Sequence, residues 1–333
     1  MRVYREYADV MRAAMESGQI RAYFQPLLYT DGFGVASAEA KCRWVSSRGK
    51  TSRAGSFVPR LIRERGICAL DWYMAGEACR FLERLKITGH GSIGVALRMS
   101  GRHIYEHDAA EHLAAIADSF LIERKMLMAA LAWRDFTRYP DEMAGMTDEL
   151  SSKGFKIIVD GCGTDIYNAL ACGGMRMDRH RLMCPGYSRM GHGATPHEQA
   201  VSHGQAISHG QAVSHEQAVS HEQAFRHESA ILRALWDSNV DFLKMDGSLV
   251  RLLCEDALGG RVLDSLVKRL RDRGINVIAG GICNARQVGF VTFHGCALLQ
   301  GDYFCEAVPE NEFLEMLDGM EKARTMTGLP ADQ

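Results

Sequence analysis

Short apolar runs alternate along the chain with stretches in which apolar residues recur at helical spacing. The runs have the length of buried strands, and the stretches between them are long enough for crossover helices. The predicted strands span residues 21–28, 34–42, 92–97, 126–133, 155–160, 240–246, 275–279 and 296–300. The predicted helices span residues 70–85, 109–120, 141–153, 261–272 and 310–320. This alternation indicates parallel βαβ units, and eight strands favour a (β/α)8 TIM-like barrel over an open sheet.

The predicted domain organisation follows from where the alternation begins, breaks and ends. Residues 1–20 form a helix that leads into the barrel, because apolar positions recur at helical spacing before Gly18. The barrel occupies residues 21–170 and 229–322, and residues 323–333 form a C-terminal tail. In such a barrel, functional side chains gather at the carboxyl ends of the strands. The polar residues predicted at those ends are Glu39, Asp160, Lys244, Asp246 and Gln300.

A repetitive segment interrupts the pattern between the fifth and sixth predicted strands. Six histidines stand at an interval of six, from His197 to His227, within repeats such as Ser-His-Glu-Gln-Ala-Val. On a helix this interval puts successive histidines on different faces, and in an extended chain it puts them about 20 Å apart. Neither geometry suits a shared metal ion, although weak metal affinity stays open. We therefore interpret residues 171–228 as a low-complexity insertion, partly flexible and partly helical.

The composition argues against nucleic acid as a partner and against membrane insertion, and it indicates a reducing compartment. The chain has 333 residues, 47% of them hydrophobic, and a net charge of −2, so it can bury a large core and carries no basic field for nucleic acid. No apolar run approaches 18 residues, which argues against direct membrane insertion. The ten cysteines show no Cys-x-x-Cys spacing, and no signal peptide is recognisable. Reduced thiols in a cytoplasmic protein are the expectation.

Five segments carry a resemblance to a known family. Tyr-Phe-Gln-Pro-Leu at 23–27 and Ala-Glu-Ala-Lys-Cys-Arg-Trp at 38–44 resemble the opening of EAL domains, bacterial domains that bind and linearise cyclic di-GMP. Here Glu39-Ala40-Lys41 stands in place of Glu-Ala-Leu. The other similar segments are residues 153–164, 242–246, 277–282 and 299–304. Their order and spacing identify residues 21–317, outside the insertion, as a degenerate member of the EAL family.

The resemblance implies a site built around divalent cations. Family enzymes hold Mg²⁺ or Mn²⁺ with carboxylates and an asparagine, because hard cations need several oxygen ligands to neutralise the phosphate and activate water. In this chain Glu39 and Asp160 keep two ligand positions, and Lys244 keeps the lysine near the water. The lost ligand positions are Ala96, Ala132, Gly161 and Gly280. We therefore expect no required cofactor, little or no hydrolysis, and Mg²⁺ or Mn²⁺ only if residual hydrolysis exists.

Two further features of the sequence bear on this loss. Asp135, Asp165 and Asp302 stand near the site segments but are more simply explained as loop or surface acids. The segment Met-Arg-Met-Asp-Arg at 175–179 mimics the sixth-strand motif, yet it follows Asp160 too closely to leave room for a helix. Lys244 therefore remains the predicted sixth-strand lysine.

A domain that has lost its catalytic residues can still bind the ligand. The nucleotide-binding candidates are Gln25, Arg43, Asp246 and Gln300. Arg43 suits bidentate contact with a phosphate, with an ion pair to Glu39 or Asp160 as the alternative. For Gln25 and Gln300 the alternative is backbone capping near strand ends. Lys41 either pairs with Glu39 or Asp160, substituting for lost metal charge, or extends to solvent.

The sequence thus predicts a catalytically inactive EAL-like regulator in bacterial cyclic di-GMP signalling that acts mainly through a partner signalling protein. The first alternative is a metal-independent cyclic di-GMP receptor, and the second is a weak metal-dependent phosphodiesterase. A homodimer is compatible with the family resemblance. The sequence itself specifies neither the partner nor the oligomeric state.

Overall fold

The computed structural model describes residues 2–106, 108–164, 166, 235–236 and 238–327. The predicted insertion at 171–228 and the 175–179 segment lie outside the described residues. The strands are β1 Ile20–Tyr29, β2 Val35–Val45, β3 Thr51–Arg53, β4 Gly94–Met99, β5 Leu127–Ala132, β6 Lys156–Cys162, β7 Phe242–Met245, β8 Asn276–Ala279, β9 Leu298–Leu299 and β10 Val308–Pro309. Eight of these, β1, β2 and β4–β9, close into a ring, with β3 and β10 paired outside it. The predicted barrel is confirmed.

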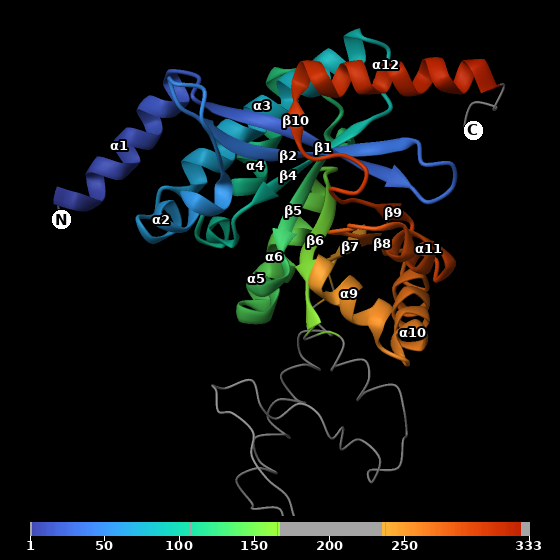
Figure 1. The fold of residues 1–333 in the computed structure, drawn as a ribbon. Helices are drawn as coiled ribbons and strands as arrows, with labels where there is room; N and C mark the ends of the chain where they lie inside the picture. Colours follow the sequence, from blue (N-terminus) through green and yellow to red (C-terminus); the bar gives the residue numbers. More distant parts are fainter. Residues whose placement is uncertain (1, 107, 165, 167–234, 237, 328–333) are drawn as a thin grey trace, which may run out of the picture.

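Helices cover the outside of this ring (Figure 1). They are α1 Arg2–Glu16, α2 Val58–Arg63, α3 Ile67–Ile87, α4 Ala109–Ser119, α5 Trp133–Arg138, α6 Pro140–Ser152, α9 Gly247–Glu255, α10 Gly259–Arg271, α11 Ala285–Phe293 and α12 Glu310–Thr327. Three short 3₁₀ helices join them in the described part, η1 Ala54–Ser56, η2 Gly101–Tyr105 and η3 Arg124–Met126. Helix α12 continues to Thr327, so it extends into the segment predicted as a tail. None of the helices in the described ranges is long and apolar enough to cross a bilayer.

The direction of the first strand differs from the all-parallel expectation. β1 runs antiparallel to both β2 and β9, whereas the other neighbours in the ring are parallel. The connection from Tyr29 to Val35 is a tight turn in which Gly32 and Phe33 adopt positive φ angles of 84° and 56°. A connection this short makes a hairpin, because a parallel pair needs a crossover of a dozen or more residues. The barrel is therefore one of mixed strands.

Two apolar clusters hold the barrel together. The larger cluster lies between the strands and the surrounding helices and includes Phe24, Phe81 and Phe313, whose rings stack or meet edge to face. The smaller cluster comes from strands alone, so it fills the ring: Leu27, Ala96, Met128, Ala130, Ile158, Ile278 and Leu298. Side chains two residues further along a strand point to the same side. Most of the strands therefore place another inward residue at the mouth of the barrel.

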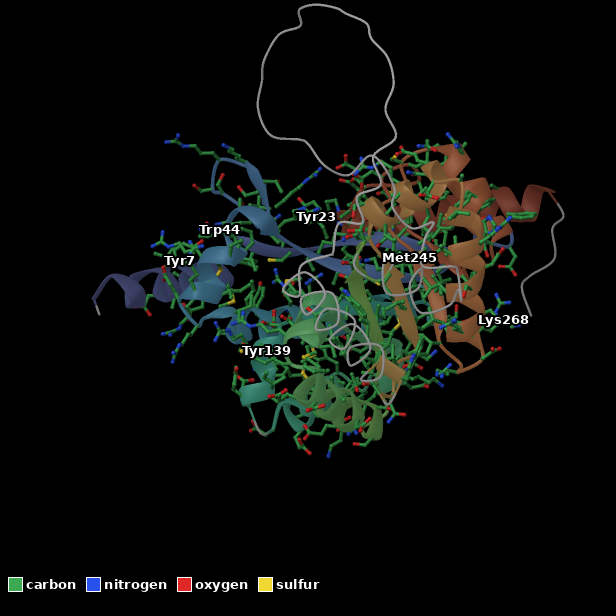
Figure 2. All side chains as sticks on the ribbon, turned by 90° about the horizontal axis from the view of Figure 1, so that it is seen from below. Tyr7, Tyr23, Trp44, Tyr139, Met245 and Lys268 are labelled. Carbon is green, nitrogen blue, oxygen red and sulfur yellow. The ribbon has the colours of Figure 1, made fainter. Side chains whose placement is uncertain are left out.

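Met245 and Trp44 are among the side chains labelled in Figure 2. Met245 at the end of β7 is part of the mouth, whereas Trp44 at the end of β2 lies toward the N-terminal helix α1. The Trp44 indole donates a hydrogen bond to the side chain of Gln19 and packs edge to face against Phe57. These contacts fix the far end of β2, which carries Glu39 and Lys41 in its middle.

Candidate functional site

A pocket of about 350 Å³ opens at the mouth of the barrel. Its lining comes from the inward residues that follow the interior cluster and from the loops after β7, β8 and β9. The lining residues used below are Gln25, Glu39, Lys41, Arg98, Asp160, Lys244, Asp246, Gly280, Gln300 and Asp302. A volume of this size lies in the range of small-molecule sites. The pocket is therefore the candidate functional site.

Lys244 is the centre of the charged groups in the pocket. Its Nζ donates to Glu39 Oε2 at 2.7 Å and lies 3.3 Å from Asp160 Oδ1. All three residues are at least nine-tenths buried, with exposures of 9%, 6% and 8% for Lys244, Glu39 and Asp160. The structure thus brings together the three family residues that the sequence analysis singled out as retained.

Two further cations complete the ion pairs. Lys41 Nζ lies 2.9 Å from Glu39 Oε1, so this lysine pairs with Glu39 rather than extending to solvent. Arg98 Nη1 donates to Asp160 Oδ2 at 2.5 Å. Two carboxylates are consequently matched by three cationic side chains.

Arg98 was missed by the sequence analysis. It follows Ala96 by two residues on β4, so both face inward, but Ala96 belongs to the interior cluster and Arg98 reaches the mouth. A signal was present, since Arg98 is the one charged residue in the otherwise apolar strand Gly94–Met99. The predicted strand ended at residue 97, which excluded it.

Electrostatics keep these buried groups ionised. Burial alone would raise the pKa of Glu39, but attraction to Lys244 and Lys41 outweighs burial and holds the pKa below its usual range. Burial alone would lower the pKa of Lys244, but attraction to Glu39 and Asp160 outweighs it and raises the pKa. The carboxylate of Glu39 and the ammonium of Lys244 are therefore charged at neutral pH.

The nucleotide-binding candidates occupy different environments. Gln25 Nε2 donates to Asp302 Oδ1 at 3.1 Å and to the Cys305 carbonyl at 3.0 Å, which ties the loop after β9 to β1. Gln300 is 3% exposed, and its Nε2 is buried without a hydrogen-bond partner. An unpaired buried donor is costly, about 1–3 kcal/mol. Gln300 is thus a donor that a ligand could satisfy.

The other two candidates are engaged locally. Asp246 caps the N-terminus of α9, where its Oδ1 accepts from the Leu249 amide at 2.8 Å. Arg43 does not line the pocket; its Nη1 donates to the Cys42 carbonyl and its guanidinium lies 5.7 Å from the centroid of the Tyr23 ring. The alternative of an ion pair between Arg43 and Glu39 or Asp160 is not what the structure records, since those acids bind Lys41, Lys244 and Arg98.

The four predicted ligand losses lie at or beneath the mouth. Ala96 and Ala132 are buried strand residues and neither lines the pocket. Gly161 forms a bulge on β6 with a φ of 83°. Gly280 lines the pocket, and a Cβ added there would come within 2.6 Å of the Met245 carbonyl oxygen and 3.2 Å of Lys244 Cε. The backbone at Gly280 therefore leaves no room for a glutamate beside Lys244.

The three other acids near the site segments lie in different places. Asp302 reaches the pocket but accepts the hydrogen bond from Gln25. Asp135 accepts from the Gly101 amide at 3.2 Å and does not line the pocket. Asp165 lies outside the described residues.

The residues present do not fit a pair of hard cations. Mg²⁺ requires near-octahedral oxygen ligands, and the oxygens of Glu39 and Asp160 are already taken by lysine and arginine at 2.5–3.3 Å. A cation would have to displace three positively charged side chains.

Comparisons with known proteins agree with this fold. The family model described as the EAL domain matches residues 8–178 and 223–307. The cyclic di-GMP phosphodiesterase PdeL of Escherichia coli (strain K12) is 32% identical over 85 residues, which are 26% of this chain and 24% of PdeL. The probable cyclic di-GMP phosphodiesterase PdeG of the same organism is 17% identical over 318 residues, which are 96% of this chain and 50% of PdeG. The chain thus spans about half the length of PdeG.

Solved structures share the architecture. The PaMucR phosphodiesterase in complex with c-di-GMP aligns with a TM-score of 0.66 at 17% identity, over 92% of this chain and 99% of that one. The FimX EAL domain of Xanthomonas citri in complex with c-diGMP aligns with a TM-score of 0.67 at 11% identity, over 92% and 95% of the two chains. Identities this low establish a common fold. Because the family model matches most of the chain, this protein belongs to the EAL domain family.

Proposed function

We propose that this chain is a catalytically silent EAL-domain regulator in cyclic di-GMP signalling, whose pocket binds the cyclic dinucleotide without metal ions. One observation carries the proposal: in the ion-pair cluster at the mouth, Lys41, Arg98 and Lys244 outnumber Glu39 and Asp160, while the other two acids of the lining, Asp246 and Asp302, accept hydrogen bonds from Leu249 and Gln25. This excess favours reception of the nucleotide over a function in protein interaction alone, which the sequence analysis had put first.

The ion-pair cluster offers cationic groups to an anionic ligand. Cyclic di-GMP carries two phosphodiesters and is a dianion, and related proteins named as phosphodiesterases or EAL domains are solved with it bound. Lys41 and Arg98 pair with Glu39 and Asp160, the two acids that by the family resemblance are cation ligands in family enzymes. Arg98 offers further N–H groups beyond the one that binds Asp160. A phosphate can accept from these groups, while the buried Nε2 of Gln300 can donate to a ligand carbonyl or ring nitrogen.

The same inventory argues against hydrolysis. Activation of water needs a bound cation or a free base, and the two retained carboxylates serve as counter-ions for lysine and arginine. A glutamate restored at position 280 would bring its Cβ into steric conflict with the Met245 carbonyl oxygen. Binding without turnover is the outcome that these contacts support.

Calorimetry in the presence of EDTA tests the proposal. We expect cyclic di-GMP to bind, and Arg98→Met to weaken binding about 10–100-fold, the value of one hydrogen bond to a charged group. The matched control is Arg102→Met, since Arg102 is an exposed arginine four residues along the chain that does not line the pocket. No heat with the unmodified chain, or an equal loss with both variants, would overturn the proposal.

The output of the receptor remains the partner signalling protein predicted from the family resemblance. If calorimetry detects no nucleotide binding, a function in protein interaction alone becomes the favoured one. Turnover of cyclic di-GMP to the linear dinucleotide with Mn²⁺, abolished by Glu39→Ala, would instead establish the weak phosphodiesterase.

A further inference from the structure

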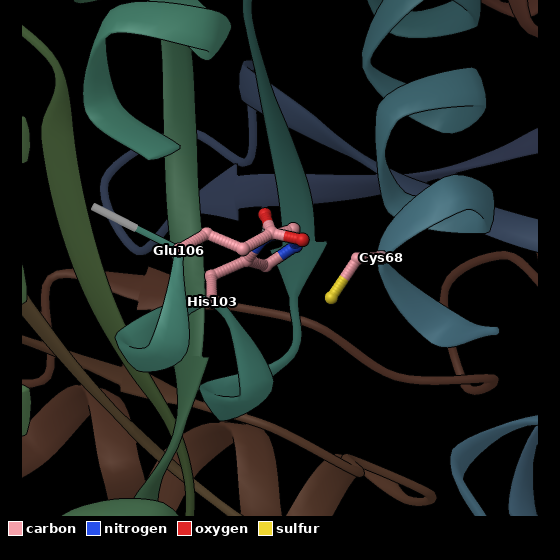
Figure 3. Close-up of side chains that lie close together, drawn as sticks. All are labelled: Cys68, His103 and Glu106. Carbon is pink, nitrogen blue, oxygen red and sulfur yellow. Dashed lines mark hydrogen bonds and ion pairs between the residues drawn. The ribbon is translucent and has the colours of Figure 1, made fainter. Parts of the chain in front are cut away.

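A second cluster of reactive side chains lies beside the barrel, outside the pocket. Cys68 comes from the first turn of α3, and His103 and Glu106 come from η2 and the residue that follows it (Figure 3). Their ligand atoms, the thiol sulfur, a ring nitrogen and a carboxylate oxygen, all lie within 4.8 Å of one another. The three side chains converge from two elements that are far apart in sequence.

The buried imidazole of His103 is held between two acids. Its Nε2 donates to Asp71 Oδ2 at 3.1 Å, and its Nδ1 lies 2.7 Å from Glu106 Oε2. The His103 side chain is fully buried, whereas the Glu106 side chain is 36% exposed and Cys68 is half-buried. Trp72 packs against the His103 ring at 4.4 Å between centroids. The ring is thus fixed in place, while one side of the cluster is open to solvent.

Asp71 has the contacts of a residue that orients a metal-binding histidine. It is 7% exposed, and its Oδ2 also accepts from the Ser100 amide at 2.8 Å. A carboxylate behind one ring nitrogen fixes the tautomer, so the other nitrogen presents its lone pair. With Nε2–H directed at Asp71, Nδ1 faces Glu106 and the open side of the cluster.

We propose that Cys68, His103 and Glu106 bind a divalent transition metal ion, Zn²⁺ being the best match, and that Asp71 positions the His103 ring. Zn²⁺ accepts thiolate, imidazole and carboxylate ligands together in tetrahedral sites, with bonds of about 2.0–2.3 Å. Ligand atoms around such an ion lie roughly 3.5 Å apart. Side-chain rotations of Cys68 and Glu106 would have to close the observed spread, and solvent can supply the fourth ligand on the exposed side. This proposal does not depend on nucleotide binding.

The charges and protons of the binding step balance. Without metal, His103 Nδ1 and Glu106 Oε2 lie 2.7 Å apart and share a proton. The ion replaces the proton between Nδ1 and Glu106 and a second proton from the thiol, so two protons leave as two positive charges arrive. The net charge of the cluster is unchanged, and no oxidant or reductant is needed.

Titration of the chelator-treated full chain with Co²⁺ provides the test. Thiolate ligation gives cobalt an intense sulfur-to-metal charge-transfer absorption, which the histidines of the repeat cannot produce because they carry no sulfur. We expect this absorption to saturate at one Co²⁺ per chain and to be displaced by Zn²⁺. Cys68→Ser should abolish it and weaken Zn²⁺ binding at least tenfold, and Asp71→Asn should weaken binding about 10–100-fold.

The matched control is Cys283→Ser, because Cys283 is an exposed free thiol outside the cluster. This variant should leave the absorption unchanged. Absorption that survives Cys68→Ser would place the ligand at another cysteine and overturn the proposal, as would the absence of absorption at millimolar Co²⁺. His103→Gln is expected to lose the site too; if it does not fold, Cys68→Ser decides, since serine replaces a half-buried thiol with a group of similar size.

Discussion

The coupling between Lys244 and Glu39 is the prediction that follows most directly from the pocket. At 2.7 Å and an effective dielectric constant of about 20, the Coulomb attraction of this pair is about 6 kcal/mol, most of which offsets the cost of burying the two charges. Loss of one partner of a buried pair usually costs about 3–5 kcal/mol. Here Glu39 keeps Lys41 and Asp160 keeps Arg98, so we expect Lys244→Met to cost about 3 kcal/mol, at the lower end.

A double-mutant cycle separates the pair from its surroundings. Urea unfolding of Lys244→Met, Glu39→Gln and the double variant, followed by circular dichroism, should give a coupling free energy of about 2 kcal/mol. The same cycle for Lys41 and Glu39 should give less than about 1 kcal/mol, because the Lys41 side chain is 29% exposed and screened by water.

An exposed lysine–glutamate pair at nearly the same distance is the control. Lys125 and Glu123 lie 2.8 Å apart with side chains 64% and 71% exposed, so water screens their attraction and their coupling should be much weaker than that of Lys244 and Glu39. If Lys244 and Glu39 couple no more strongly than this pair, burial does not strengthen the ion pair and the account of the pocket is refuted.

The remaining predictions concern stability at low pH, the steric fit of a side chain at position 280 and turnover of cyclic di-GMP. Because the folded pKa of Glu39 lies below its unfolded value of about 4.3, its contribution to stability is present above that pH and is lost as the pH falls. Urea unfolding at about pH 6 and at about pH 3 should therefore show a smaller acid-induced loss of stability in Glu39→Gln than in the unmodified chain. Gly280→Ala should cost about 1–3 kcal/mol, since its Cβ meets the Met245 carbonyl oxygen at 2.6 Å, whereas Gly289→Ala on α11 meets nothing and should be neutral or stabilising in the same denaturation assay. Chromatography of cyclic di-GMP incubated with the chain and Mn²⁺ should show no linear product, and product that depends on Glu39 would contradict the proposed silence.

Much of the fold was predictable because its signals are local. Strand and helix positions follow from periodicity within a few residues, and the observed barrel strands overlap all of the predicted ones. The direction of β1 was not predicted, although the short connection between Tyr29 and Val35 contained the signal for a hairpin. The strands β3 and β10 have three and two residues, which are too few to show an alternation of apolar and polar residues in the sequence.

The candidate site was predictable only in part. The family motifs indicated Glu39, Asp160 and Lys244, which the structure brings into contact. Arg98 pairs with an acid 62 residues away, and Lys244 with one 205 residues away, so closure of the ring decides both contacts. The sequence likewise left two conformations open for Lys41.

By itself, then, the sequence determined the strands and the family signature, because these are properties of residue type and spacing. Only the tertiary structure decided which cations bind the remaining acids, that Gly280 has no space for a side chain, and that Cys68 meets His103. The physical reason is that electrostatic and steric interactions act across a few ångströms of space. Neighbours at that range come from separate strands and helices, and only the closed barrel specifies them.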